Sequence, residues 1–277
     1  MEIPGGVLID GELNRSFAFK PVTGFLELGI NEPSLPQRCH SARITTLLCA
    51  TLEHLAGEAV HSERVRELSV ADRQYLMRQL AVHIDDQVMW LTATCGECRE
   101  LFDISLRCSD LPVKPAGHEF PETIVETSLG KLNVRVPTGA DQEAIAAIDN
   151  DREAMWTLLG RLLSHEDSRL AIDPRQLGDD EITAIETVVE DMSPEVATHL
   201  STNCPHCDRE NHVPMSPYTV IEYPLSDVYG DVHILATTYH WSEEDILALP
   251  RHRRHAYLNM IDRTRGMHRS DTDVEVG

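Results

Sequence analysis

Two Cys-x-x-Cys pairs are the residues of this chain whose types and spacing can do chemistry. The first pair is Cys95 and Cys98, and the second is Cys204 and Cys207. Four thiolates form the closed tetrahedral ligand set of a structural zinc site, which leaves no coordination position open for a substrate. The two pairs therefore predict one structural zinc ion as cofactor, and they favour a metal-stabilised scaffold over an enzyme.

The long separation of the two pairs leaves other interpretations open. There are 105 residues between Cys98 and Cys204, whereas ordinary zinc ribbons separate their pairs by about 15 to 20 residues. The alternatives are two half-sites, plain buried cysteines or a redox dithiol, and a redox pair would be expected to open a helix. Another ligand can also replace one thiolate. The candidates for that replacement are Cys108, His118, His206 and His212.

Both pairs lie where the sequence predicts the turn of a β-hairpin. Apolar and polar residues alternate before Cys95 and after Cys98, over a hairpin expected at about residues 86–110. Such alternation is typical of half-buried strands. Similar short apolar segments flank Cys204 and Cys207. We therefore expect two similar hairpins that close around one ion in a zinc-ribbon-like arrangement.

The N-terminal part of the chain combines a sheet pattern with helix patterns. Alternation of apolar and polar residues predicts a hairpin or small sheet over residues 6–30. Apolar residues at helical spacing predict a helix over residues 41–56. A second helix is expected to begin at Ser69, because its hydroxyl and Asp72 three residues later resemble a capping box.

Later segments alternate in the same way between hairpin and helix. A hairpin is predicted over residues 122–137, with its turn at Gly130. Residues 138–196 are expected to be helical and acidic, since they hold 15 carboxylates and four arginines. The simpler interpretation of this acidic segment is a pair of helices whose charges are solvated. The more specific interpretation is a docking surface for a basic partner. Helical patterns resume at about Tyr218, and the clearest begins after Ser242 as N-cap.

The expected fold class is α+β, with an N-terminal hairpin and helices, two Cys-x-x-Cys hairpins closing one zinc-ribbon-like site, and C-terminal helices. In chain order we expect an N-terminal hairpin plus helical region, the first zinc knuckle and hairpins, an acidic helical insertion, the second zinc knuckle, a C-terminal helical region and a disordered tail. The expected bounds of these parts are 1–90, 91–137, 138–200, 201–217, 218–269 and 270–277.

The composition limits the compartment and the kind of partner. An odd total of seven cysteines, with no apolar N-terminal segment, argues against a secreted disulfide framework and predicts a reducing compartment. No run approaches the roughly 18 apolar residues of a membrane span, so no membrane partner is expected. A net charge of −22 opposes nucleic-acid binding, because most of such a surface repels phosphates. The partner is expected to be a protein, and the oligomeric state stays open.

The segment from Arg251 to Arg269 is the one concentrated basic region. It holds six arginines, three histidines and one aspartate. This contrast predicts a docking site, in which the arginines bind carboxylates of a partner or of the chain's own acidic segment. The helices on either side of Pro250 also imitate a helix-turn-helix, but the net charge opposes DNA binding. The residues predicted to bind a partner are Trp241, Arg251, Arg253, Arg254 and Tyr257.

Two C-terminal segments carry a resemblance to a known family. They are "CPHCDRENHVPMSPYTVIE" at 204–222 and, more specifically, "VHILATTYHWSEEDILALPRHRRHAYLNMI" at 232–261. "FAFKPVTGFLEL", "VADRQYLMRQL" and "VRVPTGADQEA" resemble the same family more weakly. These segments resemble zinc-knuckle proteins encoded with contractile phage tails and injection systems, similar to the T-even phage baseplate hub assembly chaperone family. One departure is that Arg99 and Asp208 stand where such knuckles commonly have a glycine.

The resemblance implies a non-enzymatic assembly factor, or chaperone, that acts on baseplate hub, tube or other tail proteins. It places the protein in the bacterial cytoplasm, or retained in a phage tail or injection particle. A permanent minor structural subunit of the baseplate or tail is the main alternative. A zinc-ribbon nucleic-acid regulator and a thiol oxidoreductase follow with less support.

Overall fold

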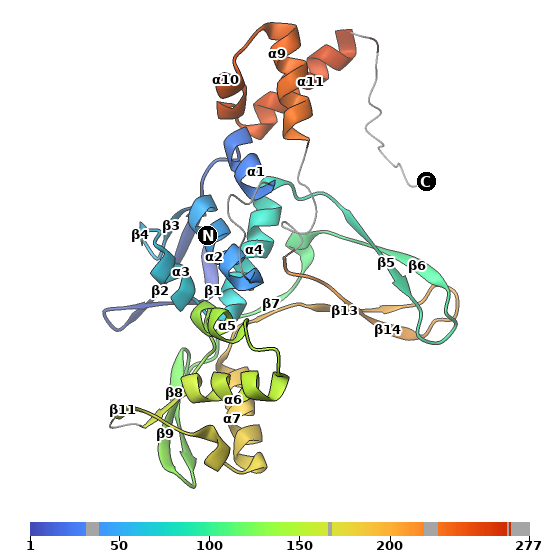
Figure 1. Ribbon diagram of the computed structural model, residues 1–277. Coiled ribbons are helices and arrows are strands. Elements are labelled where there is room, and N and C mark those ends of the chain that lie inside the picture. Colours follow the sequence, from blue (N-terminus) through green and yellow to red (C-terminus); the bar gives the residue numbers. More distant parts are fainter. Residues whose placement is uncertain (32–38, 166–167, 219–226, 265, 267–277) are drawn as a thin grey trace. The chain divides into compact units, whose positions relative to one another are not determined.

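The computed structural model describes residues 1–31, 39–165, 168–218, 227–264 and 266 (Figure 1). The chain divides into two compact units. Unit 1 comprises Met1–Lys20 and Leu35–Glu222, and unit 2 comprises Pro21–Ser34 and Tyr223–Gly277. Residues 21–34 therefore group with the C-terminal helices, whereas the sequence placed them with the N-terminal hairpin. The tail expected to be disordered, 270–277, lies outside the described residues.

The first part of unit 1 is a four-stranded antiparallel sheet with helices packed on it. The strands, in spatial order, are β1 (Glu2–Ile9), β2 (Glu12–Phe19), β3 (Leu52–Leu55) and β4 (Glu58–Ala59). The helices are α2 (His40–Thr51), α3 (Ser62–Glu67) and α4 (Val70–Ile84). The alternation in the hairpin buries Ile3 and Phe17, while α4 buries Leu76, Met77 and Leu80. The predicted hairpin is thus confirmed for β1 and β2, and the helix predicted from Ser69 is confirmed as α4. The helix predicted over residues 41–56 is confirmed for α2, but it was wrong for residues 52–55, which form β3 because β2 offers them an antiparallel partner.

The start of α4 is fixed as its sequence predicts. The Ser69 hydroxyl accepts a hydrogen bond from the Asp72 N–H at 3.0 Å, which caps the helix. The buried Asp72 carboxylate in turn accepts from the backbone N–H groups of Gly5 (2.7 Å) and Gly6 (3.2 Å) in β1. Burial raises the pKa of Asp72 against these hydrogen bonds. A Cβ at Gly5 would lie 2.4 Å from the Asp72 Oδ2, so only glycine fits there.

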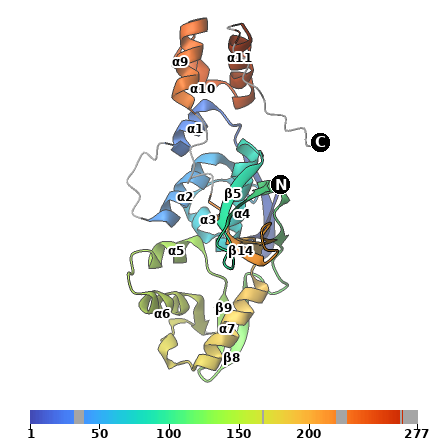
Figure 2. The same ribbon diagram turned by 90° about the vertical axis from the view of Figure 1, so that its right-hand side faces the viewer.

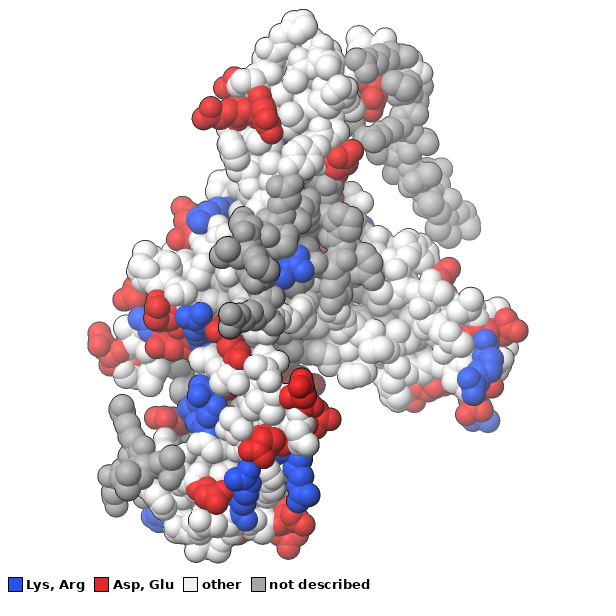
Figure 3. Space-filling view, viewed as in Figure 1, with Lys and Arg blue, Asp and Glu red and all other residues white. Residues whose placement is uncertain are grey.

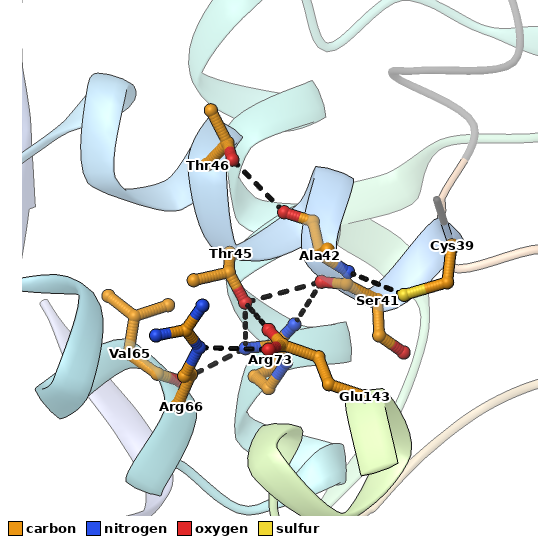
Figure 4. A network of polar contacts seen from close by, with 9 residues as sticks. All are labelled: Cys39, Ser41, Ala42, Thr45, Thr46, Val65, Arg66, Arg73 and Glu143. Atoms are coloured by element: carbon orange, nitrogen blue, oxygen red, sulfur yellow. Dashed lines mark hydrogen bonds and ion pairs between the residues drawn. The ribbon is translucent and has the colours of Figure 1, made fainter. Parts of the chain in front are cut away.

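A polar network around a buried arginine joins four helices of unit 1 (Figure 4). Arg73 of α4 is fully buried, and it donates from Nη1 to the Thr45 hydroxyl at 2.9 Å and from Nη2 to the Ser41 carbonyl at 2.7 Å. The Thr45 hydroxyl donates to Glu143 at 2.6 Å, and Arg66 Nε donates to the same carboxylate at 2.8 Å. Helix α5 (Gly139–Ile145), which carries Glu143, is thereby tied to α2, α3 and α4.

A second four-stranded sheet forms the other end of unit 1. Its strands are β8 (Glu122–Thr127), β9 (Gly130–Arg135), β10 (Leu163–His165) and β11 (Ser168–Ala171). Helices α6 (Asp151–Leu162) and α7 (Asp179–Met192) pack against this sheet, as the two views show (Figures 1 and 2). Two short strands, β7 (Val113–Lys114) and β12 (Glu195–Val196), pair nearby. The hairpin of β8 and β9, with Gly130 at φ 99°, is confirmed.

The prediction that residues 138–196 are helical throughout was wrong for β10, β11 and β12. Leu163 directly follows α6 but pairs with Val134 of β9, and its side chain joins the core of Leu132, Leu159 and Ile185. A three-residue strand is too short to show alternation, so the helical spacing that precedes it hides the change. Tertiary pairing therefore decides the structure here.

Unit 2 is a group of helices from both ends of the chain. They are α1 (Gly24–Asn31), α9 (Val228–Tyr239), α10 (Glu243–Ala248) and α11 (Arg251–Thr264). The predicted Ser242 cap is confirmed, because its hydroxyl accepts from the Asp245 N–H at 3.1 Å. A sheet across residues 24–30 was a wrong prediction. Gly24, Glu27 and Ile30 are buried at the spacing of one helical face.

Candidate metal centre

Both Cys-x-x-Cys pairs lie on the turns of β-hairpins in unit 1. Strands β5 (Met89–Thr94) and β6 (Leu101–Leu106) flank the first pair, and β13 (His199–Asn203) and β14 (Glu210–Pro214) flank the second. The two hairpins lie side by side, and Phe102 and Val213 from their inner faces pack together with the cysteines (Figure 1). Alternation in each strand turns the other face toward solvent, as the sequence predicts.

The two turns share one backbone geometry. In the first, the Cys95 N–H donates to the Glu100 carbonyl at 3.0 Å, and the Arg99 N–H donates to the Cys95 carbonyl at 3.2 Å. The second turn repeats both bonds, from Cys204 to Arg209 and from Asp208 to Cys204, each at 2.8 Å. Each turn therefore directs its two cysteine side chains in the same way.

Each turn places its residue after the second cysteine in the left-handed region. The φ angle is 64° at Arg99 and 59° at Asp208. This is the conformation for which glycine is preferred, so the departure from the knuckle pattern leaves the turn geometry in place. The left-handed conformation of Asp208 is supported by a hydrogen bond, because the Asn203 amide donates to its carboxylate at 3.2 Å.

The four sulfur atoms gather into one cluster. The Sγ atoms of Cys95, Cys98, Cys204 and Cys207 all lie within 4.8 Å of one another. Cys95 Sγ lies 3.6 Å from Cys207 Sγ, and Cys98 Sγ lies 3.7 Å from Cys204 Sγ. A tetrahedral ion with metal–sulfur bonds of about 2.3 Å requires sulfurs about 3.8 Å apart. The cluster therefore has the size that can hold a metal ion.

Polar groups around the cluster hold the two hairpins together. The Asn211 side chain accepts from the Gly96 N–H at 3.0 Å and directs its amide at Cys95 Sγ, 3.7 Å away. A His206 ring nitrogen lies 3.3 Å from the Leu101 carbonyl of the other hairpin. Such groups orient metal ligands from outside the ligand set. Asn211 is a residue that the spacing of the cysteines does not reveal, whereas His206, one of the candidate replacement ligands, lies outside the four-sulfur group.

The surroundings of the thiols favour ionisation of Cys95 and oppose that of Cys98 and Cys207. Backbone N–H groups, that of Cys98 first, outweigh burial and lower the pKa of Cys95 to about 6. At Cys98 the Glu100 N–H favours the thiolate, but burial and the neighbouring thiols raise the pKa to about 12. Four thiols in contact cannot all ionise without a compensating cation. A bound metal ion supplies that positive charge.

The alternative ligands do not join the cluster. Among the residues the structure describes, the four cysteines are the group close enough to share an ion. His212 Nδ1 lies 2.9 Å from the Ser201 hydroxyl, and Cys108 Sγ lies 3.7 Å from Met89 Sδ. His118 is exposed. Neither pair opens a helix, so the geometry expected of a redox dithiol is absent from these two described turns.

The residues predicted to bind a partner are divided between the interior and the surface of unit 2. Arg254 is fully buried and pairs with Glu27, which also accepts from Arg251 Nη1 at 2.7 Å. Arg254 Nε donates to Asp231 at 2.9 Å. Arg253 is exposed. The sequence suggested that these arginines bind carboxylates, and two of them do so within unit 2.

The two aromatic residues of that prediction belong to a packed cluster. Trp241 lies 4.9 Å, between ring centroids, from both Tyr239 and Tyr257, and the three rings pack against the core of α9, α10 and α11. Trp241 and Tyr257 are half-buried, so part of each residue remains exposed to solvent. Their predicted contact with a partner stays a prediction.

The buried charge network of unit 2 was missed by sequence reasoning. Glu27 is the one charged residue of "GFLELGIN", and a lone carboxylate in an apolar helix is the signal that marks it. Its partners lie 224 and 227 residues further along the chain. Nothing in their local spacing points back to α1.

Comparison of the chain with protein-family models, with curated proteins and with solved structures gives no match. No helix within the described ranges is long and apolar enough to cross a membrane. The arguments for function therefore start from the metal centre and from the sequence segments that carry the resemblance.

Proposed function

We propose that the four cysteines hold one structural zinc ion. Two thiolate pairs at tetrahedral spacing suit zinc or iron, and a closed set of four leaves no position for a substrate. Elemental analysis of the purified protein distinguishes the two metals. We expect one zinc per chain, and stoichiometric iron would contradict the assignment.

We further propose that the protein is a non-enzymatic assembly factor for the baseplate hub or tube of a contractile phage tail or related injection system. The observation that carries this proposal is the resemblance of residues 232–261 to such a family. Two features support it. Four cysteines that could hold an ion form a ligand set without an open position for a substrate, and this segment supplies the aromatic cluster of unit 2 together with Arg254 of its buried charge network.

Mass spectrometry of purified tail or injection particles, from cells with and without the gene, tests the assembly role. An assembly factor is needed for particles to form but is absent from the finished particle. Retention at a fixed ratio would instead identify a permanent minor subunit. Normal particles without the gene would contradict both.

Partner capture is best tested at Arg253. Replacing Arg254 would put a new group beside Glu27 and Asp231 in the interior, and any loss of capture would then be confused with unfolding. Arg253→Glu changes an exposed side chain. We expect the variant to keep its melting temperature and to retain less hub or tube protein in a pull-down. Unchanged retention would remove Arg253 from the partner surface.

A further inference from the structure

The four cysteines of the metal centre are not equally covered. Cys95 and Cys204, the first cysteine of each turn, are 0% and 2% exposed and belong to the apolar core between the two hairpins. Cys98 is half-buried and packs against that core. Cys207 is exposed. One ligand of the site therefore faces solvent, whereas the hairpins cover the other three wholly or in part.

Charged side chains surround the exposed end of the site. Figure 3 shows both signs of charge at the tip of the two hairpins, on the right of the view. The exposed charged residues of the two turns are Glu97, Arg99, Glu100, Asp208, Arg209 and Glu210. Charged side chains of this kind stay solvated. The tip of the hairpins is therefore wet, and a metal ligand dissolved in water can reach Cys207 there.

The two turns differ in how firmly each is tied to the opposite hairpin. Asn211 of β14 reaches across to the first turn, where its Oδ1 accepts from the Gly96 N–H at 3.0 Å. The contact in the other direction is longer, since a ring nitrogen of the exposed His206 lies 3.3 Å from the Leu101 carbonyl. Hydrogen bonds from N–H to oxygen usually span about 2.7 to 3.2 Å. The first turn is thus the more firmly held of the two.

The orientation of the Asn211 amide follows from its partners. A backbone N–H only donates and a carbonyl only accepts, so Oδ1 meets Gly96 and Nδ2 meets the Arg209 carbonyl at 2.8 Å. The same Nδ2 lies 3.7 Å from Cys95 Sγ and directs a donor at it. A donor beside a thiolate stabilises its negative charge. Cys95 is therefore held by this amide as well as by its own turn.

We propose that the metal ion enters and leaves the site through Cys207, while Asn211 keeps Cys95 in place as the last ligand to be released. The sulfur–metal bond of Cys207 breaks as a donor atom of an incoming ligand binds the ion, and the freed thiolate takes a proton from water. The incoming ligand offers nitrogen or sulfur donors, the classes that suit zinc. This inference rests on the proposal that the four cysteines hold a structural zinc ion.

Partial labelling tests the order of release. The full-length protein, loaded with zinc and checked by elemental analysis, is treated briefly with N-ethylmaleimide, and peptide mass spectrometry locates the label. Among the four cysteines we expect Cys207 to be labelled first and Cys95 last, with zinc passing to a chromogenic pyridylazo chelator in step with Cys207 labelling. Labelling of Cys98 or Cys204 as fast as Cys207 would overturn this inference alone. Absence of zinc in the elemental analysis would overturn the metal proposal, and this inference with it.

A variant of Asn211 separates retention of the ion from the tie between the hairpins. Asn211→Asp keeps an acceptor for the Gly96 N–H but removes the donor beside Cys95 Sγ. We expect this variant to release zinc to the chelator about tenfold faster, and its cobalt-loaded form to show the sulfur-to-metal charge-transfer band at longer wavelength. His212→Leu, at the next and exposed position of β14, should change neither. An unchanged release rate or an unshifted band in Asn211→Asp would overturn the role of Asn211.

Discussion

The metal centre of unit 1 and the buried charge network of unit 2 join distant parts of the chain by different chemistry. In the first, four like groups that repel one another when ionised are gathered on two hairpins. In the second, Glu27 and Asp231 meet Arg251 and Arg254 in the interior of a helical unit. The first therefore needs an outside cation, whereas the second carries its own counter-charges. The stability of unit 1 should depend on metal supply, and that of unit 2 should not.

Removal of the metal is expected to have the largest effect. Cys204→Ser removes one of the two buried ligands, and structural metal binding is coupled to folding. The ion also closes a chain loop of more than 100 residues, and a covalent cross-link over such a loop contributes about 4.7 kcal/mol. We expect loss of the metal and destabilisation of unit 1 by several kcal/mol, measured by elemental analysis and calorimetry.

Cys108→Ser is the control for that experiment, because Cys108 lies outside the sulfur cluster. It should keep the full metal content. Hydrogen exchange separates the two units in the same samples, and the amides of α11 should be unaffected by metal loss. Full metal loss with an unchanged melting profile would show that the ion does not hold unit 1 together.

The second prediction breaks the charge network instead. Glu27→Ala leaves Arg254 buried beside Asp231 alone, and removal of one partner from a buried ion pair typically costs about 3 to 5 kcal/mol. Exchange of the α11 amides should rise accordingly, while the metal content stays at one per chain. Glu244→Ala, at an exposed position of α10, is the matched control and should change stability by less than about 0.5 kcal/mol.

The same contrast explains which features could be predicted from the sequence. The Cys pairs, the Ser69 and Ser242 caps and the Gly130 turn depend on residues a few positions apart, so their spacing is visible. Glu27 and Arg254 are single residues 227 positions apart, and no local pattern links them. Likewise β10 is a strand because β9 and β11 offer it partners on its two sides. Asn211, which orients Cys95, has no spacing rule at all.

A third prediction concerns a charge network whose members are close in sequence. Asp141, at the start of α5, accepts from Arg135 at 2.6 and 2.9 Å and from Arg161 Nε at 2.7 Å. Burial raises its pKa, but these arginines and the Thr138 N–H outweigh burial and lower it to about 2. The folded pKa thus lies below the ordinary 3.8. The stabilisation is complete above about pH 4 and is lost as the pH falls through 2.

We expect the ionised Asp141 carboxylate to contribute about 2 kcal/mol above pH 4, and this contribution to be lost progressively as the pH falls toward 2. Urea unfolding of the metal-free protein and of Asp141→Asn, at a series of pH values from 5 to 2.5, measures this contribution. The stability difference between the two proteins should shrink as the pH falls. A difference independent of pH would mean that the ionised carboxylate is not what the arginines stabilise.

The smallest expected effect tests the turn of the first Cys pair. Arg99 has φ 64°, where a side chain is strained and glycine is not. Arg99→Gly should therefore stabilise the metal-bound protein by roughly 0.5 to 1 kcal/mol, after the added freedom of the unfolded chain is subtracted. Arg99→Ala removes the same side chain but keeps the backbone strain, so it should give no gain in stability.

Asp208→Gly should gain less stability than Arg99→Gly, because aspartate tolerates this conformation and Asn203 bonds to it. Equal gains in Arg99→Gly and Arg99→Ala, measured by urea unfolding with saturating metal, would assign the effect to the arginine side chain rather than to the backbone of the turn.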